Sequence, residues 1–258
     1  MSQLPFLKRQ ALYLRPDPAR VIVRPFKPAT EPRDLNPTDK TRANHIVDRV
    51  LAMDAEATAS QLTDVLDNFL GRHRDLLKLF EARALEMEDA FGPHAAFTLE
   101  QRQLLGAYFL NEYSFEASAL FNPSIVPHPD QSNVPEGCVR FILSLRAVGE
   151  GHVSSLTFRS GLVTLDEQIT IDPTSRLASN PKVSQSPGSE KIEVTFGADE
   201  DISERVIFPL TESQSNGIED ARFVQFHDGK NDIFYATYTA YSGRAIRSEL
   251  IETSDFVT

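Results

Sequence analysis

The spacing of hydrophobic positions changes along the chain and divides it into three parts. Residues 1–37 contain one short apolar run, Val21–Val23, whereas residues 38–115 place apolar residues at intervals of three and four. Such intervals form one stripe on a helix and predict a helical region. Residues 116–258 show short apolar runs separated by polar turns, which is typical of strands.

The first part, residues 1–37, predicts an extended arm. It holds seven of the 16 prolines of the chain. Only Val21–Val23 has the composition of a strand, and Pro25 should close it because proline cannot donate to a β-ladder. The arm is therefore expected to pack irregularly across another part of the protein.

The second part predicts four amphipathic helices. The clearest stripe runs from Leu62 to Phe69, with apolar residues at i, i+3, i+4 and i+7, and Gly71 is placed to end that helix. Asn36-Pro37 can start the first helix, and Gly92-Pro93 can stop the third. Thr98–Gln101 has the pattern of a capping box, which predicts the start of the fourth helix.

The third part predicts a mainly β region. Phe141–Leu145 reads as a buried strand, and Ser155–Arg159 alternates between apolar and polar residues. Gly161 is then expected to turn the chain into a further strand, Leu162–Leu165.

A hairpin is predicted near the C-terminal end. Arg222–Phe226 and Ile233–Tyr238 flank Asp228-Gly229, which is a frequent turn pair. Pro173–Glu190, rich in Ser, Pro and Asn, reads as a long surface excursion. Short strands joined by polar turns are compatible with a sandwich, a barrel or a propeller, and periodicity does not choose among them.

Charge and composition exclude several classes of function. The 258 residues carry a net charge of −11, and beyond the N-terminal segment the basic residues do not cluster as a nucleic-acid surface requires. The single cysteine, Cys138, allows no intrachain disulfide and no cysteine-rich zinc site. The N-terminal residues lack a signal-peptide pattern, and no apolar run could span a bilayer. We therefore expect a soluble cytoplasmic protein without nucleic-acid or membrane partners.

The first candidate for chemistry is Arg146, at the end of a very apolar strand. A buried arginine needs a carboxylate partner or an anionic or polyhydroxylated ligand. Glu150 follows, and its flanking glycines, Gly149 and Gly151, would let a carboxylate loop approach a substrate closely. A strand-end ion pair followed by a tight turn explains the same residues without any function.

The second candidate is the pair of adjacent carboxylates Glu219 and Asp220, followed by Arg222. Adjacent like charges raise the pKa of one carboxyl group, whereas a neighbouring arginine lowers it. Sugar hydrolysis requires a carboxylic acid to protonate the leaving oxygen. A solvated turn containing an Asp–Arg pair is the alternative.

Taken together, these stretches resemble glycoside hydrolase family 130. The resemblance rests on Phe121-Asn122-Pro123, Leu145-Arg146-Ala147, Gly217–Arg222 and Tyr235–Tyr241, in that order, and covers about residues 120–258. The family contains inverting β-mannoside phosphorylases and β-1,2-mannosidases built on a five-bladed β-propeller. The resemblance therefore implies a mainly β fold with an N-terminal helical region, in which a small helical unit precedes a partial five-bladed β-propeller.

The resemblance also implies a role for each matching residue. Asp220 would be the general acid and would act through a hydroxyl group of the bound mannose. Asn122, Arg146 and Arg222 would line the mannose pocket, and Glu219 would support Asp220 or the sugar. The partner would be an oligosaccharide substrate, and whether the protein forms a homo-oligomer is left undecided. No metal or cofactor is implied, although inorganic phosphate would be a co-substrate in a phosphorylase.

Three functions remain open at this stage. At about 40–50 residues per blade, residues 116–258 fit only about three blades, so the propeller is expected to be incomplete and the family's later catalytic positions to be missing. The first function is an inverting β-mannoside glycosidase, with hydrolysis favoured over phosphorolysis. The others are a mannoside-binding module without turnover and an inactive fragment that requires a second chain for the missing blades.

Overall fold

A computed structural model describes residues 10–29, 40–91, 97–229 and 232–258, and its chain forms two compact units. The helical unit is Val21–Tyr113, and the β unit combines the chain up to Arg20 with Ser114–Thr258. The fold is thus mainly β, with four α-helices among the described residues.

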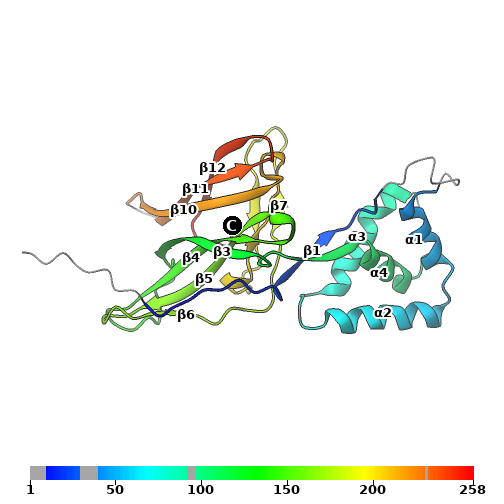
Figure 1. The fold of residues 1–258 in the computed structure, drawn as a ribbon, viewed down its shortest axis with the longest axis horizontal. Helices are drawn as coiled ribbons and strands as arrows, with labels where there is room; N and C mark the ends of the chain where they lie inside the picture. The colour runs from blue at the N-terminus through cyan, green and yellow to red at the C-terminus, as the bar shows by residue number, and fades with distance from the viewer. Residues whose placement is uncertain (1–9, 30–39, 92–96, 230–231) are drawn as a thin grey trace, which may run out of the picture. The chain divides into compact units, whose positions relative to one another are not determined.

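The helical unit contains the four helices and a two-stranded sheet around a small apolar core (Figure 1). Its buried centre includes Val50 and Phe109. The helices are α1 (Arg42–Leu51), α2 (Ala55–Phe69), α3 (Leu76–Phe91) and α4 (Leu99–Tyr108), and the sheet pairs β1 (Val21–Pro25) with β2 (Leu110–Ser114).

The predicted start of the fourth helix is confirmed. The Gln101 amide donates to the Thr98 hydroxyl at 3.2 Å, and the Gln101 side chain accepts from the Thr98 amide at 3.1 Å. The predicted signals at Asn36-Pro37 and Gly92-Pro93 lie outside the described residues, and α1 has Thr41 as its N-cap. The expected helical region ends earlier than residue 115, because the chain from Leu110 onward pairs as β2.

The β unit is built on one open sheet and a separate small hairpin. The order in the main sheet is β12-β11-β10-β5-β4-β3, with β6 and β9 also paired to β5. Its strands are β3 (Ala119–Pro127), β4 (Val139–Val148), β5 (Ser154–Val163), β6 (Ile169–Ile171), β9 (Val206–Ile207), β10 (Gly217–His227), β11 (Asp232–Tyr241) and β12 (Ile246–Thr253), and the hairpin is β7 (Lys182–Ser184) with β8 (Glu193–Thr195).

Two antiparallel meanders make up most of this sheet. The first meander is β3-β4-β5 and the second is β10-β11-β12; Figure 1 draws the second above the first. One core contains side chains of both, including Phe158 from the first and Phe223 and Phe234 from the second. All three rings lie 5.0–5.9 Å from the Phe256 ring, so the last residues of the chain help to join the meanders.

Three strand predictions are confirmed and one needs correction. Phe141–Leu145 lies within β4, Ser155–Arg159 lies within β5, and the predicted hairpin is β10 paired with β11. Gly161 does not turn the chain, because β5 continues through it to Val163; a Cβ there would lie 2.2 Å from the Thr170 carbonyl oxygen, so the glycine permits close packing of β6. The expected surface excursion Pro173–Glu190, which the structure describes throughout, contains no buried residue, and it includes the short exposed strand β7, which pairs with β8.

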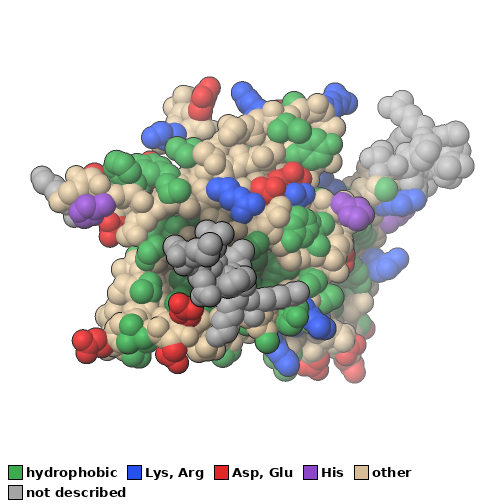
Figure 2. Space-filling model, turned by 60° about the vertical axis from the view of Figure 1, so that its left-hand side comes forward, with side chains coloured by type: hydrophobic (Ala, Val, Ile, Leu, Met, Phe, Trp, Pro, Cys, Tyr) green, Lys and Arg blue, Asp and Glu red, His purple; other side chains and the backbone are tan. Residues whose placement is uncertain are grey.

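The predicted five-bladed propeller stays a prediction. In the part of the chain that the structure describes, β3 and β12 stand at opposite ends of the strand order, so the sheet does not close. None of the described helices is long and apolar enough to cross a membrane. Acidic and basic side chains are scattered over the face shown in Figure 2.

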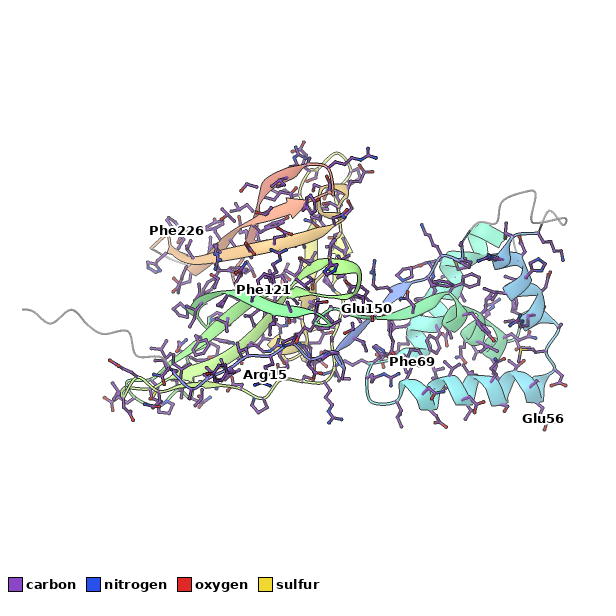
Figure 3. All side chains as sticks on the ribbon, viewed as in Figure 1. Arg15, Glu56, Phe69, Phe121, Glu150 and Phe226 are labelled. Atoms are coloured by element: carbon purple, nitrogen blue, oxygen red, sulfur yellow. The ribbon has the colours of Figure 1, made fainter. Side chains whose placement is uncertain are left out.

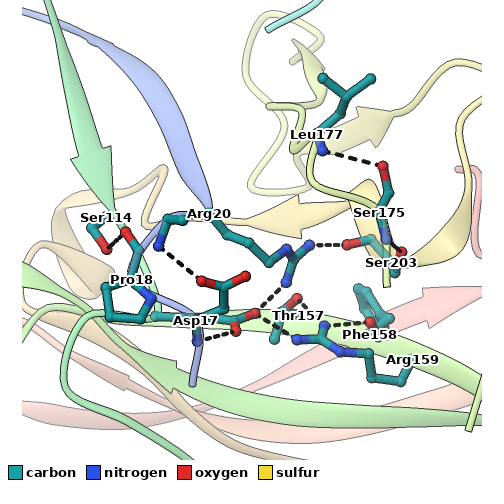
Figure 4. Close-up of polar contacts among 12 residues, drawn as sticks. Asp17, Pro18, Arg20, Ser114, Thr157, Phe158, Arg159, Ser175, Leu177 and Ser203 are labelled. Carbon is teal, nitrogen blue, oxygen red and sulfur yellow. Dashed lines mark hydrogen bonds and ion pairs between the residues drawn. The ribbon is translucent and has the colours of Figure 1, made fainter. Parts of the chain in front are cut away.

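A buried ionic cluster holds the N-terminal segment in the β unit (Figure 4). Glu116 is fully buried and accepts hydrogen bonds from Arg20, from Arg159 at 2.8 Å, and from the Asp17 amide at 3.2 Å. Arg20 also donates to the Ser203 carbonyl. Burial lowers the pKa of Arg20, and the attraction of Glu116 opposes that effect. These contacts thus join four distant parts of the chain.

Replacing Glu116 should strongly destabilise the β unit. Glu116→Gln removes the charge that compensates two buried guanidinium groups, and breaking a buried ion pair costs about 3–5 kcal/mol. Urea denaturation followed by circular dichroism measures this loss. Asp232→Asn is the control, because its ion pair with His227 is exposed and should contribute less than about 1 kcal/mol. Equal losses in the two variants would contradict the assignment.

Candidate functional site

A β-bulge interrupts β3 beside Asn122. Phe121 lies opposite Arg146 and Ser124 opposite Ser144, so β3 holds one more residue than β4 over this stretch. Asn122 has φ of 52°, a left-handed conformation that asparagine tolerates better than most residues because its short side chain can bond locally. A bulge re-aims the side chain that it carries.

A matching bulge interrupts β10, the first strand of the second meander. Glu219 lies opposite Thr239 and Arg222 opposite Thr237, which again leaves one extra residue. Asp220 has φ of 56°. Both meanders therefore begin with a strand that carries a left-handed Asn or Asp at its bulge. Residues held in such sparsely populated backbone conformations cluster at functional sites.

The two bulges present their polar side chains to each other. The Asn122 side-chain amide (Nδ2) donates to Asp220 Oδ1 at 2.5 Å, and Arg146 Nη1 lies 3.4 Å from the same oxygen. Arg146 also donates through Nη2 to Glu219 Oε1 at 2.6 Å and through Nε to Ser154 Oγ at 2.9 Å. We call Asn122, Arg146, Glu219 and Asp220 the polar cluster.

Within the polar cluster, Asp220 is the most accessible charged group. Its side chain is 40% exposed, against 19% for Arg146 and 25% for Glu219. Both donors to Asp220 use Oδ1, and among the described residues Oδ2 makes no hydrogen bond. One guanidinium faces two carboxyl groups, so the cluster offers hydrogen-bond donors and acceptors beside a partly exposed carboxyl group.

Arg222 makes a different contact from the other predicted site residues, and its predicted role in lining a mannose pocket stays a prediction. It does not join the ion pairs of the polar cluster; instead its Nη1 donates to the Pro123 carbonyl at 2.8 Å. The neighbouring Phe223 amide donates to Ser124 Oγ at 2.9 Å. These two bonds hold the bulges of β3 and β10 together, so Arg222 is placed to fix the geometry of the site.

Sequence reasoning missed Ser154 and gave no role to Ser124, although both support the site. The register of the β4–β5 hairpin could have signalled Ser154, because Val148 pairs with Ser154 and so places it near Arg146. Glu150 lies in the short 3-10 turn η2 (Glu150–His152) that joins β4 to β5, and it is labelled in Figure 3. Within the described ranges, no group of three or more His, Cys, Asp or Glu side chains could hold a metal ion.

A second polar network lies on β11 and its neighbours, opposite the β10 bulge. Tyr238 lies on β11 opposite the bulge, and its hydroxyl donates to Glu249 at 2.6 Å and accepts from Gln214 at 2.7 Å. Burial, and then Glu249, raise the pKa of Tyr238. Burial alone would raise the pKa of Glu249, but the hydrogen bonds from Tyr238, Ser213 and Gln214 outweigh it and hold that pKa below its ordinary value.

Comparisons with known proteins find distant structural likenesses. No protein-family model matches the sequence, and a search of curated proteins found no match. The chain is similar to a glycosyl hydrolase from Bacteroides ovatus, at 14% identity and a TM-score of 0.33 over 57% of this chain and 32% of that one. A structure from the GH130 family of mannoside phosphorylases, which contains glycoside hydrolases that target β-1,2 mannosidic linkages in Candida mannan, gives the same values.

These structural neighbours are glycoside hydrolase-like proteins, and this chain spans about a third of their length. Because the likeness is this distant, we base the functional argument on the polar cluster and its geometry.

Removing the Tyr238 hydroxyl should lower the free energy of unfolding more at neutral pH than at acidic pH. The depressed pKa of Glu249 contributes stability that is present above the ordinary pKa of glutamate and is lost as the pH falls through the folded-state pKa. Tyr238→Phe should therefore cost about 1.5–3 kcal/mol at neutral pH and less in acid, as for a hydrogen bond to a charged group. Denaturant unfolding at a series of pH values measures this difference. A penalty that grows on acidification would contradict the sign.

Substitutions at Asn122 should separate backbone strain from the lost side chain. Asn122→Gly and Asn122→Val both remove the bond to Asp220, but only valine is strained at φ of 52°. The valine variant should be less stable than the glycine variant by about 1–2 kcal/mol or more. Urea denaturation of both variants gives the difference, and equal stabilities would show that the bulge relaxes.

Proposed function

We propose that this protein is a glycosidase that acts on β-linked mannosides by an inverting mechanism, with hydrolysis favoured over phosphorolysis. The observation that carries the proposal is the polar cluster: residues from three separate strands meet at two facing bulges and surround one accessible carboxyl group. The sequence motifs that resemble glycoside hydrolase family 130 contain these same residues.

Asp220 is proposed as the general acid. Glycosidic bond cleavage requires a proton for the leaving oxygen, and the resemblance implies that it passes through a hydroxyl group of the bound mannose. Oδ2 is the oxygen placed for this transfer, because both protein donors contact Oδ1. Asn122 and Arg146 orient the carboxyl group and offer donors to sugar hydroxyls.

Glu219 and Arg222 are proposed as supporting residues. Glu219 holds one arm of the Arg146 guanidinium at 2.6 Å, which fixes the plane of that group next to Asp220. Arg222 binds the carbonyl of the opposite bulge and so keeps Asn122 within reach of Asp220. The proposed substrate is an oligosaccharide, and inorganic phosphate enters only if the reaction is a phosphorolysis.

Asp220→Asn should abolish most of the activity. The purified protein is incubated with β-1,2-mannobiose, with and without inorganic phosphate, and proton NMR follows the products. Mannose indicates hydrolysis and mannose 1-phosphate indicates phosphorolysis, and an inverting reaction releases the α-anomer first. Loss of the general acid should lower kcat by about 10²–10⁴-fold, because proton transfer by a positioned group typically contributes this much.

Asp232→Asn is the matched control for this experiment. It makes the same chemical change on β11 at a residue whose described ion pair, with His227, is exposed, and it should retain wild-type turnover. Turnover that survives in Asp220→Asn would remove the proposed acid. Binding of the disaccharide without any product would identify a binding module, and activity that appears only after a second chain is added would identify a fragment.

A further inference from the structure

We infer that Phe121 is the surface against which the sugar ring packs, and that it selects β-linked over α-linked mannosides. The inference deepens the proposed function and rests on it. Phe121 immediately precedes Asn122 and lies opposite Arg146, so it borders the polar cluster on β3. It keeps 36% of its surface exposed. Figure 3 labels its side chain on the ribbon.

Arg146 contacts the Phe121 ring and favours one orientation of it. The guanidinium carbon lies 5.1 Å from the ring centroid, within the distance of a cation–π contact. Arg146 is in turn held by Glu219 and Ser154. An exposed aromatic ring that is held in place offers contact area at a low cost in conformational entropy, which suits a binding surface.

The shape of a β-mannoside complements such a ring. Its hydrogens on C1, C3 and C5 point to one face of the pyranose and form an apolar patch, which fits the electron-rich face of an aromatic ring. In an α-mannoside the substituent on C1 projects from that same face and would collide with the ring. The C2 hydroxyl of mannose points to the opposite face, so discrimination between mannose and glucose falls to the polar groups.

A second exposed phenylalanine provides an internal comparison. Phe226 on β10 is 54% exposed and contacts Tyr235, with ring centroids 6.3 Å apart. It follows the β10 bulge by several residues, and its chain neighbours Gln225 and His227 are exposed. Like Phe121 it lies on the first strand of a meander, but at a distance from the bulge, so the same substitution at Phe226 should leave sugar binding unchanged.

The inference is tested by saturation-transfer difference NMR and by titration with methyl β-D-mannopyranoside and methyl α-D-mannopyranoside. In the wild type, saturation of aromatic protons should pass to the sugar hydrogens on C3 and C5, and the β-anomer should bind more tightly. Phe121→Leu should weaken binding of the β-anomer by about tenfold, the size expected for one lost aromatic contact. Phe121→Tyr, which retains the ring, and Phe226→Leu should both bind like the wild type.

The outcomes separate this inference from the proposed function. If the wild type cleaves or binds β-mannosides and Phe121→Leu binds them with unchanged affinity, Phe121 is not the surface that packs against the sugar. The proposed function would then still stand. If Phe121→Tyr is as weak as Phe121→Leu, the aromatic ring is not the contact and the inference is again overturned. If the wild type neither binds nor cleaves any mannoside, the proposed function itself fails.

Discussion

The contact between Asn122 and Asp220 is the constraint on which the candidate site depends. The two residues lie on separate strands, each in a left-handed conformation at a bulge, and each side chain meets the other because both backbones deviate from regular pairing. Arg146 adds a charged contact to the same oxygen and a second one to Glu219. Without both bulges these side chains would follow the ordinary alternation of a strand, and the cluster would not form.

The packing below the cluster explains how such a contact is maintained. Phe158, Phe223 and Phe234 surround Phe256, so both meanders share one apolar core beneath the bulges. On the neighbouring strand β11, Tyr238 belongs to the same core, and its hydroxyl binds Glu249 and Gln214 opposite the β10 bulge. The buried pairing of Glu116 with Arg20 and Arg159 secures the N-terminal segment to the same unit. Left-handed backbone and exposed polar groups are therefore supported by ordinary packing and satisfied hydrogen bonds.

Local sequence signals predicted the features of the fold that depend on a few adjacent residues. The capping box at Thr98 and the hairpin around Asp228-Gly229 were visible because each depends on a few adjacent residues. The role of Gly161 was mistaken because its reason is the close approach of Thr170 from a neighbouring strand, which no local pattern records. The motifs identified the residues of the polar cluster and Arg222, but not the bonds that Arg222 and Ser124 make. Those bonds join residues 99 positions apart in the chain, and only the fold reveals them.

The similarity of the two bulged strands has a consequence for how the site comes into being. Each meander supplies half of the Asn122–Asp220 contact, and the halves are 98 residues apart in the chain. A chain with only one meander in place therefore holds only one partner of that contact, and it lacks half of the shared core as well. Formation of the polar cluster and burial of the aromatic core thus depend on the same association of the two meanders.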